Sequence, residues 1–418
     1  MLKLLVIAPY FDAEVPGESW STYKWLEGLC RHCEVTILTT HGKGWNFENS
    51  PTNAVEVVDW PDVSLPDRFA RINHEMAPGY AVFYYRARKW IKARLRNGWD
   101  FDLVHQINPL ALRYPSPAAG LGLLYVIGPL AGSLPTPPGF ASEETDKQWF
   151  RKLRHLDGLR LRYDPFLRQT YSDAALILGV APYVQELLSG NKLHRYEIMS
   201  ETGVDVVPDE GEIAPKIGGA LKLLFVGRII RTKGVLDAIR AVADAAKLSS
   251  LRFDIIGDGD QLEECKSEVL RLGIDNSVSF HGRVPREDID EFYRNADVFL
   301  FPSFREPSGN VVFEAMSHGL PVITSTVGGP GFLVTDACGI RIAPTAPGEY
   351  ATLLGHAINK LAGNASLVAE MSNSARRRLG EVALWQSKIR RMLDLYSEIL
   401  NERLSVETQN GVSPAENQ

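Results

Sequence analysis

The chain alternates short apolar segments with longer amphipathic ones, and this alternation occurs in two successive series. The short segments are rich in Val, Ile, Leu and Phe, which is typical of strands buried on both faces of a parallel sheet. The first series predicts strands at 4–8, 35–39, 55–58, 103–105, 123–127 and 175–178. The second predicts strands at 221–227, 252–256, 278–280, 298–301, 322–324 and 340–342. Amphipathic stretches between such strands predict an α/β fold with two parallel sheets.

A stretch rich in Pro, Gly and acidic residues separates the two series and has the composition of a linker. With 418 residues the chain is too long for one ordinary hydrophobic core, so two domains are expected. We predict a first domain at 1–206, a linker at 207–220 and a second domain at 221–384. The polar residues 405–418 are predicted to form a disordered tail.

Charge and hydropathy exclude several classes of protein. The net charge of −6 argues against a general nucleic-acid binder. No apolar run approaches the roughly 20 residues that a membrane-spanning helix needs. Segment 1–9 is shorter than an export signal, contains one lysine and leads into Asp12 and Glu14, so we interpret it as a buried strand. A soluble, cytoplasmic protein is expected.

The sequence predicts neither a metal nor a bound cofactor. Cys30 and Cys33 have the spacing of a redox or zinc motif, but no second Cys or His pair accompanies them, which favours a structural role in a reducing cytoplasm. The turn at 257–259 follows a strand, yet it lacks the third glycine of a dinucleotide fingerprint because residue 262 is Leu. No His-x-x-x-His pair or acidic cluster of metal-binding spacing occurs in the sequence.

Residues 301–316 carry the strongest indication of function. Glu306 and Glu314 flank a turn containing Gly309, after an apolar strand and before a helix predicted to open at 308–310. The unpaired N–H groups at a helix start form an anion site. Carboxylates do not bind an anion, so we expect the two glutamates to hold hydroxyl groups close to it. Phosphate together with hydroxyls indicates a sugar nucleotide.

Two cations follow the first strand of the second series. Arg228 and Lys233 lie in the loop after Gly227, at the carboxyl end of a predicted strand, where open α/β sheets bind ligands. A guanidinium binds phosphate with two hydrogen bonds, and an ammonium adds a point charge. The two residues predict neutralisation of a departing diphosphate, and the alternative is a pair of solvated loop cations.

In combination these motifs resemble the donor half of the retaining glycosyltransferases of family 4, over residues 221–404. The main matches are Gly-Arg followed by Lys-Gly at 227–234 and Glu-x7-Glu at 306–314. Supporting matches are Phe280-His-Gly282, Ala296-Asp-Val-Phe-Leu-Phe-Pro-Ser303, Gly319-Leu-Pro-Val-Ile323, Val327-Gly-Gly-Pro330 and the segment 385–396. The resemblance implies the GT-B fold, two facing Rossmann-like domains with parallel sheets, in which a helix at 385–404 returns to the first domain.

The resemblance also implies a role for individual residues. Arg228 and Lys233 would bind the donor diphosphate, and Glu306 would contact hydroxyls of the transferred sugar. Glu314 would bind the ribose hydroxyls. The remaining donor contacts would come from the backbone around Gly227, Ser308, Gly309, Asn310 and Val311. The catalytic candidates are Arg228, Lys233, Glu306 and His105, and no divalent metal is implied.

The first half matches the family less closely. Gly17 is the one glycine in the loop where the family places a glycine-rich turn, and we predict that its backbone approaches the donor phosphate. A plain surface turn is the alternative. His105 ends a predicted strand and resembles a histidine that faces the cleft in the family. It is predicted to assist acceptor binding or transition-state stabilisation, and the alternative is a core histidine.

Two basic segments bear on partners. Residues 84–96 combine six cations with three aromatic side chains in a predicted helix, and residues 151–162 form a second basic segment. Basic helices with aromatic residues suit an anionic membrane surface. The alternative is a pair of solvated helix faces whose long side chains cover an apolar core.

Together these features predict a retaining glycosyltransferase that moves a hexose from a UDP- or GDP-linked sugar to a glycan or lipid-linked acceptor. Polysaccharide or glycoconjugate biosynthesis in the cytoplasm, or at the inner face of the membrane, would use such an enzyme. Two alternatives stay open. A nucleotide-sugar 2-epimerase shares the same fold, because fold alone does not fix function. A non-catalytic scaffold of a polysaccharide assembly complex is the other.

Overall fold

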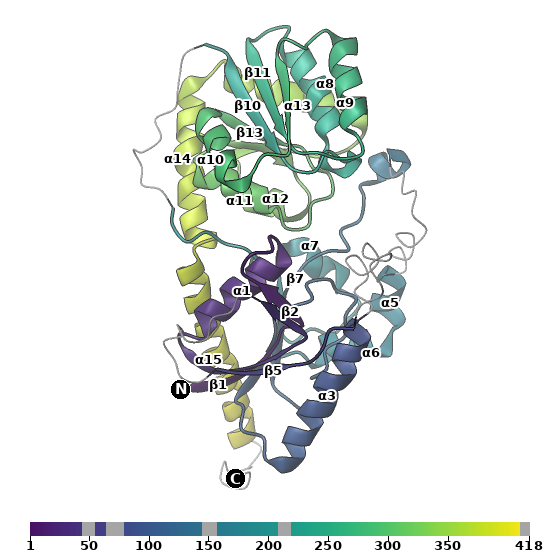
Figure 1. Ribbon diagram of the computed structural model, residues 1–418, viewed down its shortest axis with the longest axis vertical. Helices are drawn as coiled ribbons and strands as arrows, with labels where there is room; N and C mark the ends of the chain where they lie inside the picture. The colour runs from purple at the N-terminus through teal and green to yellow at the C-terminus, as the bar shows by residue number, and fades with distance from the viewer. Residues whose placement is uncertain (44–54, 64–78, 144–156, 208–218, 410–418) are drawn as a thin grey trace. The chain divides into compact units, whose positions relative to one another are not determined.

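The computed structural model describes residues 1–43, 55–63, 79–143, 157–207 and 219–409 (Figure 1). The chain divides into two compact units. The first contains Met1–Ser133, Gln148–Glu201 and Trp385–Gln418, and the second contains Leu134–Lys147 and Thr202–Leu384. Most of the predicted linker, namely 208–218, and the first half of the basic segment, 151–156, lie outside the described residues.

This division differs from the predicted one in two places. The first boundary falls after Glu201 instead of after residue 206, because Val204 pairs with the second unit: its N–H donates to the carbonyl oxygen of Ala383 at 2.9 Å. Residues 134–147, predicted to belong to the first domain, belong to the second unit. The cause is Phe140, which is fully buried in the second unit's core.

A parallel sheet of seven strands forms the centre of the first unit, in the order β5-β3-β1-β6-β7-β8-β9. The strands are β1 Leu2–Ile7, β3 Cys33–Thr39, β5 Val55–Asp59, β6 Leu103–Gln106, β7 Tyr125–Leu130, β8 Leu176–Gly179 and β9 Tyr196–Ile198. All six predicted strands are present. The short, partly exposed β9 was not predicted, nor were the strands β2 Tyr10–Asp12 and β4 His41–Lys43, which form a separate pair.

Helices cover both faces of this sheet. They are α1 Glu18–Leu29, α3 Tyr80–Asn97, α5 Asp157–Tyr163, α6 Pro165–Asp173, α7 Pro182–Leu187 and α15 Trp385–Gln409. On one face, α1 and α15 pack together through Leu26, Met392 and Tyr396. His105 points to that face, and the next residue of β6, Gln106, therefore points to the opposite face, where its amide contacts Tyr80 of α3.

Helix α15 extends to Gln409, so the first five residues of the predicted disordered tail are helical instead. No glycine or proline interrupts the sequence from Trp385 until Gly411. Helix propagation therefore meets no breaker where we predicted its end. Within the described residues, no helix combines the length and the apolar character needed to cross a bilayer.

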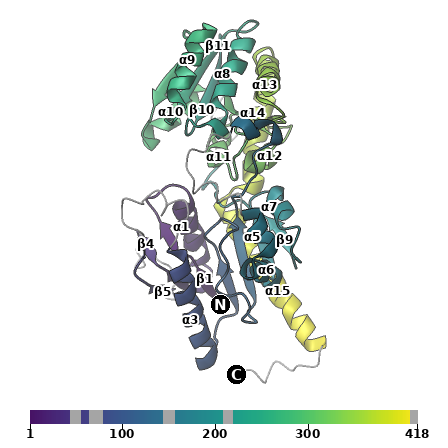
Figure 2. The same ribbon diagram turned by 90° about the vertical axis from the view of Figure 1, so that its right-hand side faces the viewer.

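The second unit repeats the design with six parallel strands in the order β12-β11-β10-β13-β14-β15. The strands are β10 Leu221–Val226, β11 Leu251–Ile256, β12 Val278–Gly282, β13 Val298–Phe301, β14 Val322–Ser325 and β15 Gly339–Ile342, and all six were predicted. The helices are α8 Val235–Ala245, α9 Leu262–Leu272, α10 Arg286–Asn295, α11 Asn310–Ser317, α12 Gly328–Leu333, α13 Pro347–Ala362 and α14 Ala365–Val382. Helices α8 and α13 lie side by side (Figure 1, Figure 2).

Strand order reverses between β1 and β6 in the first unit and between β10 and β13 in the second. At such a switch point the two neighbouring strands continue into loops that diverge, and open α/β sheets bind ligands in the crevice between them. In the second unit these loops are residues 227–234 and 302–309, the two segments on which the sequence predicted a site.

Candidate active site

The two loops of the second unit are held together by hydrogen bonds between their backbones and side chains. The N–H of Phe304 donates to the carbonyl oxygen of Thr232 at 3.2 Å, and the hydroxyl of Ser303 donates to the same oxygen at 2.9 Å. Both loops start from adjacent strands, β10 and β13, whose last four residues are buried. The site is therefore built on rigid elements, which is what precise positioning of side chains requires.

Lys233 and Glu306 form an ion pair across these loops. Both side chains are largely buried, with 14% and 13% of their surface exposed. The Lys233 ammonium also lies 5.4 Å from the centre of the Phe301 ring. Burial, together with the positive charge of Arg228, lowers the pKa of Lys233 to about 7. The structure thus brings two predicted site residues into contact. An anionic ligand can replace the Glu306 carboxylate as the partner of the Lys233 ammonium.

The start of α11 lies next to this pair. The second oxygen of the Glu306 carboxylate accepts a hydrogen bond from the Gly309 N–H at 3.1 Å. Gly309 has φ +85°, and a Cβ there would lie 2.7 Å from Cγ of Pro330, so only glycine fits. Helix α11 then begins at Asn310, as predicted, with Val311 in its first turn.

Asn310 carries an unusual polar atom. Its side-chain oxygen Oδ1 is buried and has no hydrogen-bond partner among the described residues. A buried acceptor without a donor is costly, typically about 1–3 kcal/mol, and is often satisfied by a ligand or water. Ser308 precedes it in the same turn. The turn that the sequence predicted to bind phosphate and sugar therefore has an unused acceptor.

Glu314 lies in the second turn of α11 and is half-exposed. The hydroxyl of Tyr293 donates to its Oε2 at 3.2 Å, and the Arg286 guanidinium lies 4.0 Å from its Oε1. Burial raises the pKa of this carboxyl. The Tyr293 ring stacks on His318 with 5.0 Å between ring centres. Glu314 is thus held by neighbours but keeps an accessible carboxylate.

Arg228 differs from Lys233 in its surroundings. Its side chain is exposed and forms no hydrogen bond or ion pair with the described residues. Gly227, which precedes it at the end of β10, is fixed by a hydrogen bond from its N–H to the carbonyl of Ile256 at 3.0 Å. The base of the loop is therefore fixed while the guanidinium remains available to a ligand.

The candidates Gly17 and His105 lie in the first unit. Gly17 precedes α1 with φ +95°, is exposed, and has no atom within 4 Å of the place that a Cβ would occupy. Its backbone is accessible, and its approach to a phosphate stays a prediction.

His105 is a core residue, in contrast to the role predicted for it. Its side chain is fully buried: Nδ1 accepts a hydrogen bond from the Tyr396 hydroxyl at 2.5 Å, and Nε2 donates to the Gly128 carbonyl oxygen at 2.8 Å. Burial lowers its pKa to about 4, so the ring is neutral at physiological pH. Both ring nitrogens are engaged within the protein and neither is left for an acceptor. The imidazole instead joins β6 to β7 and α15.

Sequence reasoning missed a polar cluster at the carboxyl edge of the first sheet. Oε1 of Glu18 accepts hydrogen bonds from the Tyr10 hydroxyl at 2.6 Å and the Leu110 N–H at 2.7 Å, and burial raises the Glu18 pKa. Asn108 donates to the carbonyl oxygen of Tyr10 at 2.6 Å, while its own Oδ1 is buried without a partner among the described residues. The position of Asn108 directly after a buried strand was the signal available in the sequence.

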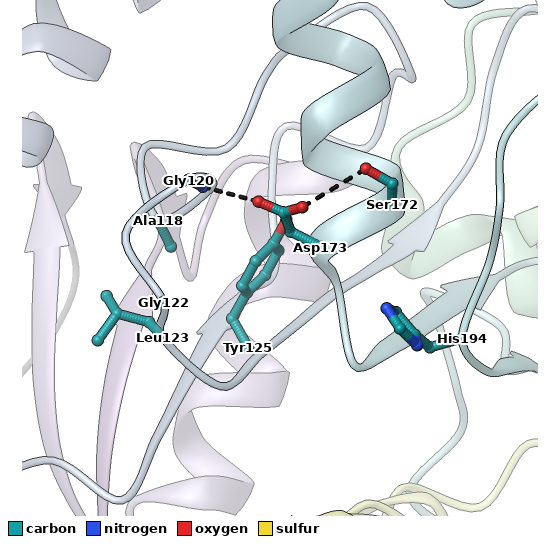
Figure 3. Close-up of a pocket in the computed structure, with 8 residues that line it drawn as sticks. All are labelled: Ala118, Gly120, Gly122, Leu123, Tyr125, Ser172, Asp173 and His194. Carbon is teal, nitrogen blue, oxygen red and sulfur yellow. Dashed lines mark hydrogen bonds between the residues drawn. The ribbon is translucent and has the colours of Figure 1, made fainter.

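A surface hollow in the first unit lies elsewhere (Figure 3). It is found at the amino ends of β7, β8 and β9, opposite the edge where open α/β sheets bind ligands. Asp173 accepts a hydrogen bond from the Gly120 N–H there at 2.9 Å. The lining residues are Ala118, Gly120, Gly122, Leu123, Tyr125, Ser172, Asp173 and His194, none of which was predicted as a site residue.

The cysteines have the environment of structural residues. All four are buried free thiols. Burial raises the pKa of Cys30 to about 12 and that of Cys33 to about 11, which makes both thiols unreactive near neutral pH. Over the described part of the chain, no group of three His, Cys, Asp or Glu side chains has the geometry to hold a metal ion.

Comparison with known proteins agrees with the geometry of the second unit. Residues 209–378 match the family model described as glycosyl transferases group 1. The matched residues include most of the second unit and less than half of the chain. The chain is 34% identical over 169 residues to 2-deoxystreptamine glucosyltransferase of Streptomyces kanamyceticus, covering 40% of each chain. It is 30% identical over 198 residues to D-inositol 3-phosphate glycosyltransferase of Acidothermus cellulolyticus, covering 45% of this chain and 43% of that protein. The aligned segments thus span less than half the length of these relatives.

Solved structures match nearly the whole chain at low identity. Sucrose-phosphate synthase of Thermosynechococcus elongatus has a TM-score of 0.61 at 16% identity, covering 96% of this chain and 100% of that chain. Anabaena HepE, solved with UDP and glucose, has a TM-score of 0.60 at 17% identity, covering 95% and 100%. These structural likenesses confirm the predicted GT-B fold.

Proposed function

We propose that this chain is a retaining hexosyltransferase that uses a UDP- or GDP-linked sugar and transfers the sugar to a glycan or lipid-linked acceptor. The observation that carries the proposal is the Lys233–Glu306 ion pair, which lies beside the start of α11 at the switch point of the second sheet. The pair combines a cation for a diphosphate with a carboxylate for sugar hydroxyls. Anabaena HepE, whose structures contain UDP and UDP-glucose, supports a UDP-linked donor.

The proposed chemistry is stabilisation of the departing nucleoside diphosphate. Arg228 and Lys233 supply positive charge, and the N–H groups at the start of α11 supply hydrogen bonds to the growing negative charge. When a diphosphate binds, its negative charge favours the charged form of Lys233, so the pKa of that ammonium rises from about 7. Donor binding near neutral pH is therefore accompanied by proton uptake at this residue.

Retention follows, in this proposal, from a front-face displacement. The bond between the anomeric carbon and the phosphate oxygen breaks, and the acceptor oxygen bonds to the same face of that carbon. The acceptor's hydroxyl proton passes to the leaving phosphate oxygen. Glu306 orients the sugar by accepting hydrogen bonds from its hydroxyls and does not attack the anomeric carbon. No divalent metal enters this scheme.

A membrane surface is the proposed location of a lipid-linked acceptor. Of the six cations at 84–96, Arg86, Arg88 and Arg94 are bound to backbone carbonyls or to Glu56. Lys89, Lys92 and Arg96 are exposed, and their spacing of three and four residues places them on one stripe of α3, together with Tyr85. Exposed basic and aromatic side chains on one helix face suit anionic headgroups.

A turnover assay with candidate donors tests the proposal and separates it from the two alternatives. A hexosyltransferase consumes UDP- or GDP-sugar only with an acceptor, and proton NMR of the product gives the anomeric configuration of the new bond. Conversion of the nucleotide sugar to its epimer without any acceptor would indicate a 2-epimerase. Failure to bind any nucleotide would indicate a scaffold. An inverted product would overturn the retaining mechanism alone.

A further inference from the structure

Part of the first half of the chain is built into the second unit. Residues 134–143, here called the crossover segment, directly follow the loop after β7 and belong to the second unit. Their last six residues form a short 3₁₀ helix, Pro138–Glu143, and Phe140 in it is fully buried in the second unit's core. At Gly139 a Cβ would lie 1.5 Å from the carbonyl oxygen of Thr345, so the backbones are in direct contact. The segment is therefore tightly packed into this unit.

The crossover segment contacts the loops that carry the candidate active site. The Phe140 ring stacks on Phe304 with 4.2 Å between ring centres and an angle of 28° between the ring planes. The Arg231 guanidinium lies 5.4 Å from the centre of the Phe140 ring and 5.2 Å from that of Phe304. The Glu143 carboxylate accepts a hydrogen bond from Nε of Arg231 at 2.8 Å. One aromatic ring and one carboxylate of the segment thus hold both loops.

These contacts involve residues next to the Lys233–Glu306 ion pair in both loops. Arg231 precedes Lys233 by two residues, and Phe304 precedes Glu306 by two. The backbone hydrogen bond from Phe304 to Thr232 joins the two loops at the same level. The other end of the segment reaches a third loop, because Leu134 packs against Gly328, and the N–H of the next residue, Gly329, donates to the Glu306 carbonyl oxygen at 3.1 Å. A shift of the segment therefore moves the backbone on both sides of the pair.

We propose that the crossover segment sets the geometry of the Lys233–Glu306 pair, with Phe140 and Glu143 as positioning residues. The inference rests on the proposed donor reaction, and neither residue contacts the substrate in it. Arg231 does not need Glu143 for burial, since it also makes two hydrogen bonds with Asp237, at 2.6 and 3.1 Å. What Glu143 adds is a fixed direction for the guanidinium beside the two stacked rings. Displacements of about 1 Å at a catalytic group can reduce rates about 100-fold.

The test uses the full-length chain and a matched pair of core variants. Phe140→Leu keeps the site apolar but removes the stack on Phe304 and Arg231. Phe253→Leu is the control, because Phe253 is buried in the same core within β11, in register with Leu223 and Val278 of the neighbouring strands and not with a residue of either site loop. Phe140→Leu is expected to lower kcat about 10- to 100-fold with the UDP dissociation constant within about threefold of the parent's. Phe253→Leu should lower Tm by a similar amount but leave kcat unchanged.

Glu143 provides a second and milder perturbation. Glu143→Ala removes the acceptor while Asp237 still pairs with Arg231, so the protein should fold, and kcat should fall several-fold. Glu143→Gln keeps an oxygen that accepts from Arg231 and should restore most of the rate. Equal kcat in Phe140→Leu and Phe253→Leu, or no rescue by Glu143→Gln, would overturn the positioning role.

A readout without turnover separates this inference from the proposed function. The reactivity of Lys233 towards acetic anhydride, followed by mass spectrometry from pH 6 to 10, reports the environment of its amine. The midpoint should shift in Phe140→Leu and stay unchanged in Phe253→Leu. If the parent protein turned over no nucleotide sugar but this difference appeared, the proposed function would fail and the geometric role would stand. If the parent were active and neither readout distinguished the two variants, the geometric role would fail alone.

Discussion

The two sheets carry different chemistry at their carboxyl edges. In the second unit, the edge holds a buried ion pair, Lys233–Glu306, with the exposed Arg228 in the same loop as Lys233. In the first unit, the corresponding edge holds groups that are neutral or hydrogen-bonded within the protein, such as His105 and Glu18. Positive charge favours an anionic ligand, and a polar uncharged surface suits hydroxyl groups. The difference supports the proposal that the second unit binds the charged donor and the first unit the acceptor.

The largest expected effect is the loss of positive charge at the second edge. Arg228→Ala and Lys233→Ala should each lower kcat/KM about 10²–10³-fold, by analogy with the loss of one donor that stabilises a developing negative charge. Because the Arg228 side chain is exposed and forms no hydrogen bond or ion pair with the described residues, its variant should keep the parent's Tm. Lys247→Ala, an exposed lysine of the same unit, is the control. Full activity in both variants would refute the role of this positive charge in the donor reaction.

The neutral state of His105 at the first edge can be tested through the pH dependence of stability. The unfolded imidazole titrates near pH 6.5, while the folded one has a pKa of about 4. Below pH 6.5 the unfolded state therefore binds more protons, and the free energy of unfolding should fall by about 3 kcal/mol between pH 6.5 and 4 from this residue. Urea unfolding at both pH values measures the change. The reference is His105→Phe, which has no titrating group at this buried position. An equal loss in the variant would show that His105 is not its source.

Glu314 tests whether the second edge also recognises hydroxyl groups. Glu314→Gln removes the charge while keeping the shape, so a hydrogen bond between a carboxylate and a hydroxyl becomes a neutral one. The dissociation constant for the nucleotide should rise about 10-fold, since hydrogen bonds to charged groups contribute about 1.5–3 kcal/mol. Isothermal titration calorimetry gives this constant directly. Glu291→Gln, at an exposed position of α10, should leave it unchanged, and equal affinities in both variants would refute the role of Glu314.

The smallest effect concerns the exposed cations of α3, Lys89, Lys92 and Arg96. Each lysine close to an anionic membrane contributes about 1 kcal/mol of binding. Lys89→Ala should therefore weaken sedimentation with vesicles containing phosphatidylserine about fivefold, and raised salt should weaken it further. Arg88→Ala should affect folding more than vesicle binding, because Arg88 donates to the carbonyl oxygens of Pro117 and Ala119. Unchanged sedimentation of Lys89→Ala would remove α3 from the proposed membrane contact.

The two edges also differ in how far the sequence could predict them. Arg228, Lys233, Glu306 and Glu314 could be proposed from the sequence because they lie in compact motifs that follow strands, and the structure brings Lys233 and Glu306 into contact. His105 was misinterpreted because its state depends on Tyr396, which lies 291 residues away on α15. Glu18 was missed for a similar reason: it receives a hydrogen bond from Leu110, and pairs separated by 92 residues leave no local signal.

Strands were predicted better than boundaries for a related physical reason. Each predicted strand is a continuous apolar run, and its burial on both faces determines its type. The assignment of residues 134–147 to a unit depends instead on where Phe140 is buried. Its ring packs against Phe304 and Tyr350, which are far from it in the sequence, so local patterns do not predict the assignment. The end of α15 depended on the absence of a breaker before Gly411, a signal that was present in the sequence and was not used.

The most direct test of the account is nucleotide binding by the second unit of the intact protein. Thermal unfolding is measured with UDP, GDP, ADP and their common sugar conjugates, for the parent and for Arg228→Ala. A ligand that binds only the folded state at 100 times its dissociation constant stabilises it by about 2.7 kcal/mol. The account predicts a rise in Tm with one nucleotide and its sugar conjugate, and loss of most of that rise in Arg228→Ala. No rise with any nucleotide, or an equal rise in the variant, would contradict it.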